Sequence, residues 1–139
     1  MNELAPKNNV AEGKPRPSLL PLDVYIKYVC PAYEEGVIKY ETESWRKGFP
    51  VSVMFDALQR HITAFFYKGE DIDKDAYETT GIKKHHLGAA MFCLASILHT
   101  LETKPELDDR PVKRTQLVKE FKPGGAQWIE TERGKTWKS

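Results

Sequence analysis

Acidic residues form two short clusters whose spacing could hold a hard cation. Glu34 and Glu35 are adjacent, and Glu70 and Asp73 lie three positions apart in an acidic run. The second spacing would place both carboxylates on one side of a helix if a helix continued through Gly69. Mg²⁺ and Mn²⁺ prefer carboxylate oxygens and keep positions open for water and phosphate. For the second cluster alone, a solvated acidic loop is the more common explanation.

Glu34 and Glu35 fall near the end of the first expected helix, where the helix dipole disfavours acidic side chains. A metal ion or Lys39 could offset this cost. An exposed pair at a frayed helix end is an equally good interpretation.

A short segment combines aromatic rings that could stack on a base with cations that could bind phosphate. These residues are Lys39, Tyr40, Trp45, Arg46 and Lys47. They are suitable for a nucleotide, although such segments also occur as plain interface patches. The chain contains no Walker loop, no G-x-G-x-x-G and no G-x-S-x-G motif, so the corresponding enzyme classes have no support.

Histidines occur at two places that could serve phosphate binding. His61 belongs to the apolar stripe of a helix, with Arg60 toward the edge of that stripe, and a satisfied core histidine is the common alternative. His85 and His86 open the next long helix, where free N–H groups favour an anion, although a helix cap is equally possible. Together with Cys93 these histidines lack the short spacings of a structural zinc site.

Apolar periodicity predicts three helices and an all-α fold. The first covers residues 22–37 and is kinked or split by Pro31, the second covers 53–65, and the third covers 87–101. Residues 70–84 have no such period and are expected to form a connecting loop.

The two ends of the chain differ in composition from its centre. Residues 1–21 are rich in proline and predict an irregular arm, 22–104 form the helical domain, and 105–139 form a polar extension. Within that extension, residues 127–131 and 135–137 could pair as a short β-hairpin.

Composition favours a cytoplasmic protein with one core. The chain has 139 residues, 40% hydrophobic and 29% charged, with a formal net charge of +1. It contains no apolar run near the roughly 20 residues needed to span a bilayer, and no secretory signal pattern. Cys30 and Cys93 are expected to be reduced. The balanced charge argues against a nonspecific nucleic-acid binder, although the segment after residue 112 is locally basic.

The third expected helix carries a continuous apolar stripe that one chain could cover only in part. The stripe consists of Leu87, Met91, Leu94, Leu98 and Leu101. This pattern is typical of a bundle or dimer seam, so we expect the helical bundle to be completed by oligomerisation.

Short motifs follow one another in order between residues 14 and 102. They are Lys14-Pro15, Leu19-Leu20-Pro21, Gly36-Val37-Ile38-Lys39-Tyr40, Ser44-Trp45-Arg46-Lys47-Gly48, Ala57-Leu58-Gln59-Arg60-His61, Gly69-Glu70 with Asp73, Thr80-Gly81 and His85-His86-Leu87-Gly88. This series resembles a phage-associated dATP/dGTP diphosphohydrolase family, related to the MazG-like nucleotide pyrophosphohydrolases. The ordered series is more specific than any one motif.

The resemblance implies an all-α oligomer that uses Mg²⁺ or Mn²⁺ to cleave a nucleoside triphosphate into monophosphate and pyrophosphate. The usual pattern is Glu-Glu-x-x-Glu followed by Glu-x-x-Asp. Here position 38 is Ile, and His85-His86 stands where a Glu-Glu-Leu-Gly form would have two acids. The resemblance therefore leaves the exact metal ligands open.

Residue types and resemblance together predict hydrolysis of dGTP or dATP at the α-phosphorus. The expected metal ligands are Glu35, Glu70 and Asp73, and the expected catalytic residues are Glu34, which could activate water, with Arg60 and His61. The expected substrate-binding residues are Lys39, Tyr40, Trp45, Arg46, Lys47, His85 and His86. The alternative is a non-catalytic helical oligomeric interaction module. The preferred base, the number of metal ions and the choice between a dimer and a tetramer stay open.

Overall fold

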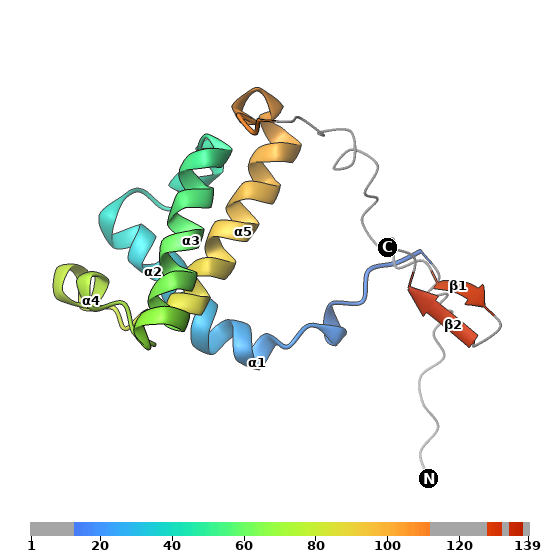
Figure 1. Ribbon diagram of the computed structural model, residues 1–139, viewed down its shortest axis with the longest axis horizontal. Coiled ribbons are helices and arrows are strands. Elements are labelled where there is room, and N and C mark those ends of the chain that lie inside the picture. The colour runs from blue at the N-terminus through green and yellow to red at the C-terminus, as the bar shows by residue number, and fades with distance from the viewer. Residues whose placement is uncertain (1–12, 112–127, 132–133, 138–139) are drawn as a thin grey trace, which may run out of the picture. The chain divides into compact units, whose positions relative to one another are not determined.

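The computed structural model describes residues 13–111, 128–131 and 134–137, which are mostly helical (Figure 1). The chain divides into two compact units, Pro21–Lys119 and the two ends Met1–Leu20 with Glu120–Ser139. The central unit holds the long helices, which confirms the predicted all-α class.

The first helical segment runs without a break from Leu22 to Lys39, because Pro31 is accommodated by a change of helix type. It consists of α1 (Leu22–Val24), the π-helical turn η2 (Tyr25–Val29) and α2 (Cys30–Lys39). Pro31 has no N–H to donate, and the wider turn directly before it closes on a bond from the Cys30 N–H to the Tyr25 carbonyl. The expected kink or split is therefore a π-helical turn.

Two long helices pack side by side and run in opposite directions, as Figure 1 shows. They are α3 (Val51–Lys68) and α5 (His86–Thr103). Their buried contact consists of Met54, Leu58, Ala90 and Cys93, flanked by Phe49, Ala57, Phe92 and Ile97. Both helices were predicted from the apolar period, and each extends a few residues beyond the predicted bounds.

The connection between α3 and α5 is more ordered than the expected loop. It contains α4 (Lys74–Thr80), whose first N–H groups are capped by the Asp73 side chain through a 3.1 Å bond from the Ala76 N–H. Gly69 ends α3 in the left-handed region at φ 64°. The helix therefore does not continue through Gly69, and the i, i+3 argument for Glu70 and Asp73 was wrong.

Backbone hydrogen bonds tie the start of this connection to its end. The Asp73 N–H donates to the Lys84 carbonyl at 2.8 Å, and the His86 N–H donates to the Asp71 carbonyl at 2.8 Å. Ile72 and His85 form an antiparallel bridge between these bonds. This pairing brings the acidic segment next to the first turn of α5.

Gly88 lets α5 approach the π-helical turn closely. A Cβ atom at this position would lie 1.8 Å from the carbonyl oxygen of Tyr28. Only glycine fits such a backbone contact, which fixes the start of α5 against η2.

The remaining elements are short. They are the 3₁₀ turns η1 (Pro17–Leu19), η3 (Ser44–Lys47) and η4 (Pro105–Leu107), and the strands β1 (Trp128–Thr131) and β2 (Gly134–Trp137). The strands pair antiparallel, with Trp128 opposite Trp137, which confirms the predicted hairpin. Most of the predicted arm and extension, including residues 1–12 and 112–127, lies outside the described residues.

The apolar stripe of α5 is divided between the core and the surface. Leu101 is buried, whereas Leu87, Leu94 and Leu98 are exposed. Within the described part of the chain, no helix is both long and apolar enough to cross a membrane.

Candidate functional site

A pocket of about 810 Å³ opens among α2, the segment after it, α3 and α5. Its volume is typical of small-molecule sites. Its lining includes these residues predicted from the sequence: Glu35, Lys39, Tyr40, Trp45, Arg46, Arg60 and His61. The structure therefore brings the basic and aromatic residues together with one acid of the first cluster.

Glu35 is a buried carboxylate held between two lysines. It is 4% exposed, its Oε1 lies 2.7 Å from Lys39 Nζ, and its Oε2 accepts a hydrogen bond from Lys84 Nζ. Burial would raise the pKa of the Glu35 carboxyl, but the hydrogen bonds from the two lysines outweigh burial and hold this pKa below its ordinary value. Glu35 is therefore ionised, and the two adjacent lysines offset its negative charge.

Lys84 connects Glu35 to Asp73. It is 8% exposed, and its Nζ lies 3.5 Å from Asp73 Oδ2. Burial would raise the pKa of Asp73, but the Ala76 N–H and the charge of Lys84 together lower this pKa. Lys84 was not predicted as a site residue. It is adjacent to a second lysine, Lys83, and nothing in the sequence shows that Lys84 is buried while Lys83 is exposed. No local signal could have found it.

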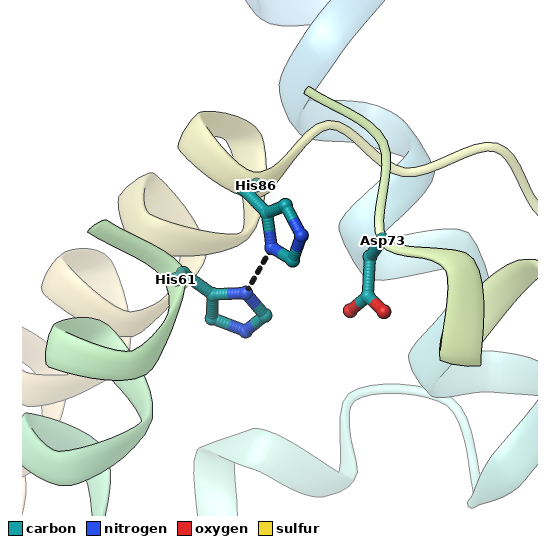
Figure 2. Close-up of side chains that lie close together, drawn as sticks. All are labelled: His61, Asp73 and His86. Atoms are coloured by element: carbon teal, nitrogen blue, oxygen red, sulfur yellow. Dashed lines mark hydrogen bonds between the residues drawn. The ribbon is translucent and has the colours of Figure 1, made fainter. Parts of the chain in front are cut away.

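His61, Asp73 and His86 converge from three elements (Figure 2). His61 lies on α3, Asp73 precedes α4, and His86 is the first residue of α5. One potential ligand atom from each lies within 4.8 Å of the others, and the Nδ1 atoms of the two histidines are 2.9 Å apart. His61 also lines the pocket, so the cluster borders it.

The two imidazoles are in different environments. Burial, reinforced by the charges of Lys84 and His86, lowers the pKa of His61 to about 4, so His61 is neutral near pH 7. His86 is 6% exposed, and its buried Nε2 has no hydrogen-bond partner. The nearest acid is Glu70, whose Oε2 lies 3.6 Å from this nitrogen.

These contacts distinguish the three carboxylates predicted to bind metal. An ion at Glu35 would have to displace an ammonium group, because each of its oxygens faces a lysine. Asp73 lies among two imidazoles, and Glu70 lies beside His86. The donor set that fits a metal ion is therefore His61, Asp73 and His86, because one potential ligand atom from each lies within 4.8 Å of the others.

Aromatic side chains form one wall of the pocket. The ring centroid of Trp45 lies 5.7 Å from Tyr33 and 6.4 Å from Phe92, both in edge-to-face contact, and Arg46 lies 4.5 Å from the Trp45 ring. Tyr40 lines the same pocket and is 68% exposed. Trp45 and Tyr40 were predicted from the sequence, whereas Tyr33 on α2 and Phe92 on α5 were not, because an aromatic residue within a helix is usually a core residue.

The other predicted site residues lie outside the pocket lining. Glu34 is exposed on α2, and Lys47 is exposed and pairs with Glu41 at 3.5 Å. His85 caps α5, since its Nδ1 accepts the Leu87 N–H at 2.9 Å. His85 therefore has the capping role that was the alternative to phosphate binding.

The part of the chain that matches a known protein family contains the whole of this site. A family model described as dATP/dGTP diphosphohydrolase, N-terminal, matches residues 5–110, which include the whole pocket and the histidine–aspartate cluster. Neither the curated proteins nor the solved structures contain a match to the chain. The family match covers well over half of the sequence, so the chain belongs to the dATP/dGTP diphosphohydrolase N-terminal family.

Proposed function

We propose that this chain hydrolyses a purine deoxynucleoside triphosphate, dGTP or dATP, to the monophosphate and pyrophosphate. The observation that carries the proposal is one pocket that combines cationic side chains with an aromatic wall, in a chain of this family. Because such nucleotides are substrates inside cells, the proposal places the protein in the cytoplasm.

The cationic side chains would bind the triphosphate. Lys39, Arg46, Arg60 and Lys84 all line the pocket. Phosphoryl transfer depends mainly on positioning and on stabilising charge at the phosphate oxygens. Glu35 would act as a positioning residue, because its carboxylate holds the ammonium groups of Lys39 and Lys84 at the pocket wall.

A divalent ion would neutralise further phosphate charge and activate the attacking water. Asp73 is the carboxylate best placed to hold it, because it belongs to the cluster that borders the pocket through His61. Attack of water at the α-phosphorus breaks the bond to the β-phosphate oxygen and releases pyrophosphate. The family resemblance implies Mg²⁺ or Mn²⁺, and the two imidazoles beside Asp73 favour Mn²⁺ of these two ions.

Trp45 and Tyr40 would recognise the base. The edge contacts with Tyr33 and Phe92 fix the Trp45 ring, whereas the exposed Tyr40 is free to close over a ligand. A purine offers a larger stacking surface than a pyrimidine. This arrangement supports purine nucleotides as the substrate class.

The test uses purified protein with each dNTP and Mg²⁺ or Mn²⁺, and measures pyrophosphate and orthophosphate separately. We expect pyrophosphate from dGTP or dATP, and none after EDTA. A β,γ-methylene analogue should still be cleaved, whereas an α,β-methylene analogue should resist. In H₂¹⁸O the label should enter the monophosphate. Glu34→Gln tests the water-activating role predicted from the sequence.

Orthophosphate as the sole product would contradict cleavage at the α-phosphorus. No turnover with any dNTP would leave the non-catalytic helical interaction module as the better account.

Lys83→Gln is the control for Lys84→Gln, because Lys83 is the exposed neighbour of the buried lysine.

The proposed assembly is a homo-oligomer that covers the outer face of α3 and α5. Phe55, Ile62 and Phe66 are exposed on α3, and Leu94 and Leu98 are exposed on α5. Ile62 and Phe66 follow Phe55 by seven and eleven residues, so the three side chains share one face of α3. A second copy of the chain, presenting the same apolar face, would remove these side chains from water.

A further inference from the structure

We infer that His61, Asp73 and His86 form a binding site for a transition-metal ion such as Mn²⁺, Co²⁺ or Zn²⁺, selective against Mg²⁺. The inference goes beyond the proposed hydrolysis, because it concerns which ion this chain binds in the absence of nucleotide. Four observations support it.

The distance between the two imidazoles matches that of two ligands on one ion. Ligand nitrogens about 2.1 Å from a metal are about 3.0 Å apart in octahedral geometry and about 3.4 Å apart in tetrahedral geometry. The two Nδ1 atoms are 2.9 Å apart. Asp73 contributes the third ligand atom within 4.8 Å, so a small side-chain rotation completes a set of two histidines and one carboxylate.

His86 has an unpartnered polar atom at this site. Its side chain is 8% exposed, and its Nε2 is buried without a hydrogen-bond partner. A buried polar atom of this kind costs free energy unless a ligand or partner satisfies it. Glu70, whose Oε2 lies 3.6 Å away, is the side chain that could satisfy this nitrogen, which leaves the other ring nitrogen, Nδ1, as the ligand atom for an ion.

Glu70 is placed to orient His86 as a metal ligand. When one imidazole nitrogen binds a metal, the other commonly donates its N–H to a carboxylate. Glu70 Oε2 lies 3.6 Å from His86 Nε2, while His86 Nδ1 faces His61. With Nδ1 on the ion, the Nε2–H would face Glu70, which acts as a positioning residue.

The charges and donor types favour a transition metal. Two imidazoles and one carboxylate are ligands for Mn, Fe, Co and Zn, whereas Mg²⁺ requires mainly oxygen ligands. Lys84 lies 3.5 Å from Asp73 and offsets its negative charge. Binding at this cluster must therefore depend on the imidazole nitrogens more than on electrostatic attraction, which discriminates against Mg²⁺.

The alternative is a purely structural pair, in which one neutral imidazole donates to the other across the same 2.9 Å. Metal titration of the full-length protein without nucleotide separates the two. Protein treated with EDTA and dialysed is titrated with Co²⁺, followed by visible absorption and calorimetry, and then challenged with Zn²⁺ or Mg²⁺.

We expect one Co²⁺ per chain, with the visible absorption of nitrogen-bound cobalt, displaced by Zn²⁺ and not by a hundredfold excess of Mg²⁺. His61→Gln and Asp73→Asn should each weaken Co²⁺ binding by at least tenfold. His99→Gln, which removes a histidine outside the cluster, should bind like the parent. Glu70→Gln should weaken binding by a smaller factor while the absorption spectrum persists.

Equal Co²⁺ affinity in the parent, His61→Gln and Asp73→Asn would overturn the site, as would displacement by equimolar Mg²⁺. Because His61 and Asp73 are partly buried, folding of every variant is checked by thermal unfolding without metal. A parent protein that gains thermal stability with Zn²⁺ while folded His61→Gln does not would support the site. These measurements contain no nucleotide, so their outcome is independent of whether pyrophosphate is released.

Discussion

The ammonium group of Lys84 forms a buried ion pair with the carboxylate of Glu35, which lies 49 positions earlier in the chain. The pair joins α2 to the segment that precedes α5 and leaves Lys84 within 3.5 Å of Asp73. Lys84 thereby connects the pocket lining to the histidine–aspartate cluster. Breaking this pair should affect both stability and function.

Lys84→Met should lower the free energy of unfolding by about 3 kcal/mol, because removing one partner of a buried pair leaves the other charge incompletely compensated. Lys39 remains beside Glu35 and limits the loss. Urea denaturation measures the effect. Lys83→Met, at the exposed neighbouring position, should change stability by no more than about 0.5 kcal/mol. Equal effects of the two substitutions would show that the buried pair contributes little.

Stability should fall at acidic pH in part because Glu35 loses its charge. Its folded pKa lies below the ordinary value of 4.5, so its stabilising contribution is present above that pH and is lost as pH falls through the folded pKa. Unfolding free energies of the metal-free parent and Glu35→Gln should therefore converge below about pH 4.5. The difference between the two proteins isolates Glu35 from other titrating groups. A constant difference down to pH 3 would contradict this linkage.

Gly88→Ala should destabilise the protein by about 2 kcal/mol or more, because the new Cβ would meet the Tyr28 carbonyl oxygen and the backbones must separate. Gly36→Ala is the matched control within a helix. A Cβ at Gly36 meets nothing within 4 Å, and alanine is the better helix former by about 1 kcal/mol. Thermal unfolding should therefore move in opposite directions for the two substitutions. A Gly88→Ala protein as stable as the parent would exclude the close contact.

Asp73→Asn should reduce pyrophosphate release by at least about a hundredfold while folding persists, because asparagine also caps a helix but supplies no negative charge to an ion. Glu70→Gln should reduce the rate by about tenfold, since Glu70 acts through His86. Initial rates across a Mn²⁺ titration measure both effects. Parental rates for Asp73→Asn at every Mn²⁺ concentration would remove Asp73 from the site.

Light scattering should show the parent protein as an oligomer rather than a monomer of 15.9 kDa. Leu94→Glu combined with Leu98→Glu should dissociate it, because two charges would have to be buried in the apolar face of α5. Tyr77→Glu alters an exposed ring on a different helix, α4, and should leave the assembly intact. A monomeric parent at micromolar concentration would contradict the proposed oligomer.

The sequence by itself determined the long helices, because their causes are local. Apolar residues at helical spacing predict α3 and α5, and Gly69 after the last apolar residue marks the end of α3. The pairing of β1 with β2 was predicted from strand-forming residues on either side of positions 132–134. The π-helical turn was not predicted, because Pro31 disfavours a regular helix and only the surrounding packing decides how the backbone adapts.

The tertiary structure decided which polar groups are buried and which of them meet. The sequence identified His61, His86 and Asp73 separately, and it grouped Asp73 with Glu70 on the condition that the helix continued through Gly69, whereas α3 ends at Lys68. Backbone pairing of Ile72 with His85 brings Asp73 to the start of α5, and the packing of α3 on α5 brings His61 to His86. Burial of Lys84 follows from the same contacts. Periodicity records which face of a helix is apolar, whereas the proximity of polar residues on different elements depends on how those elements pack.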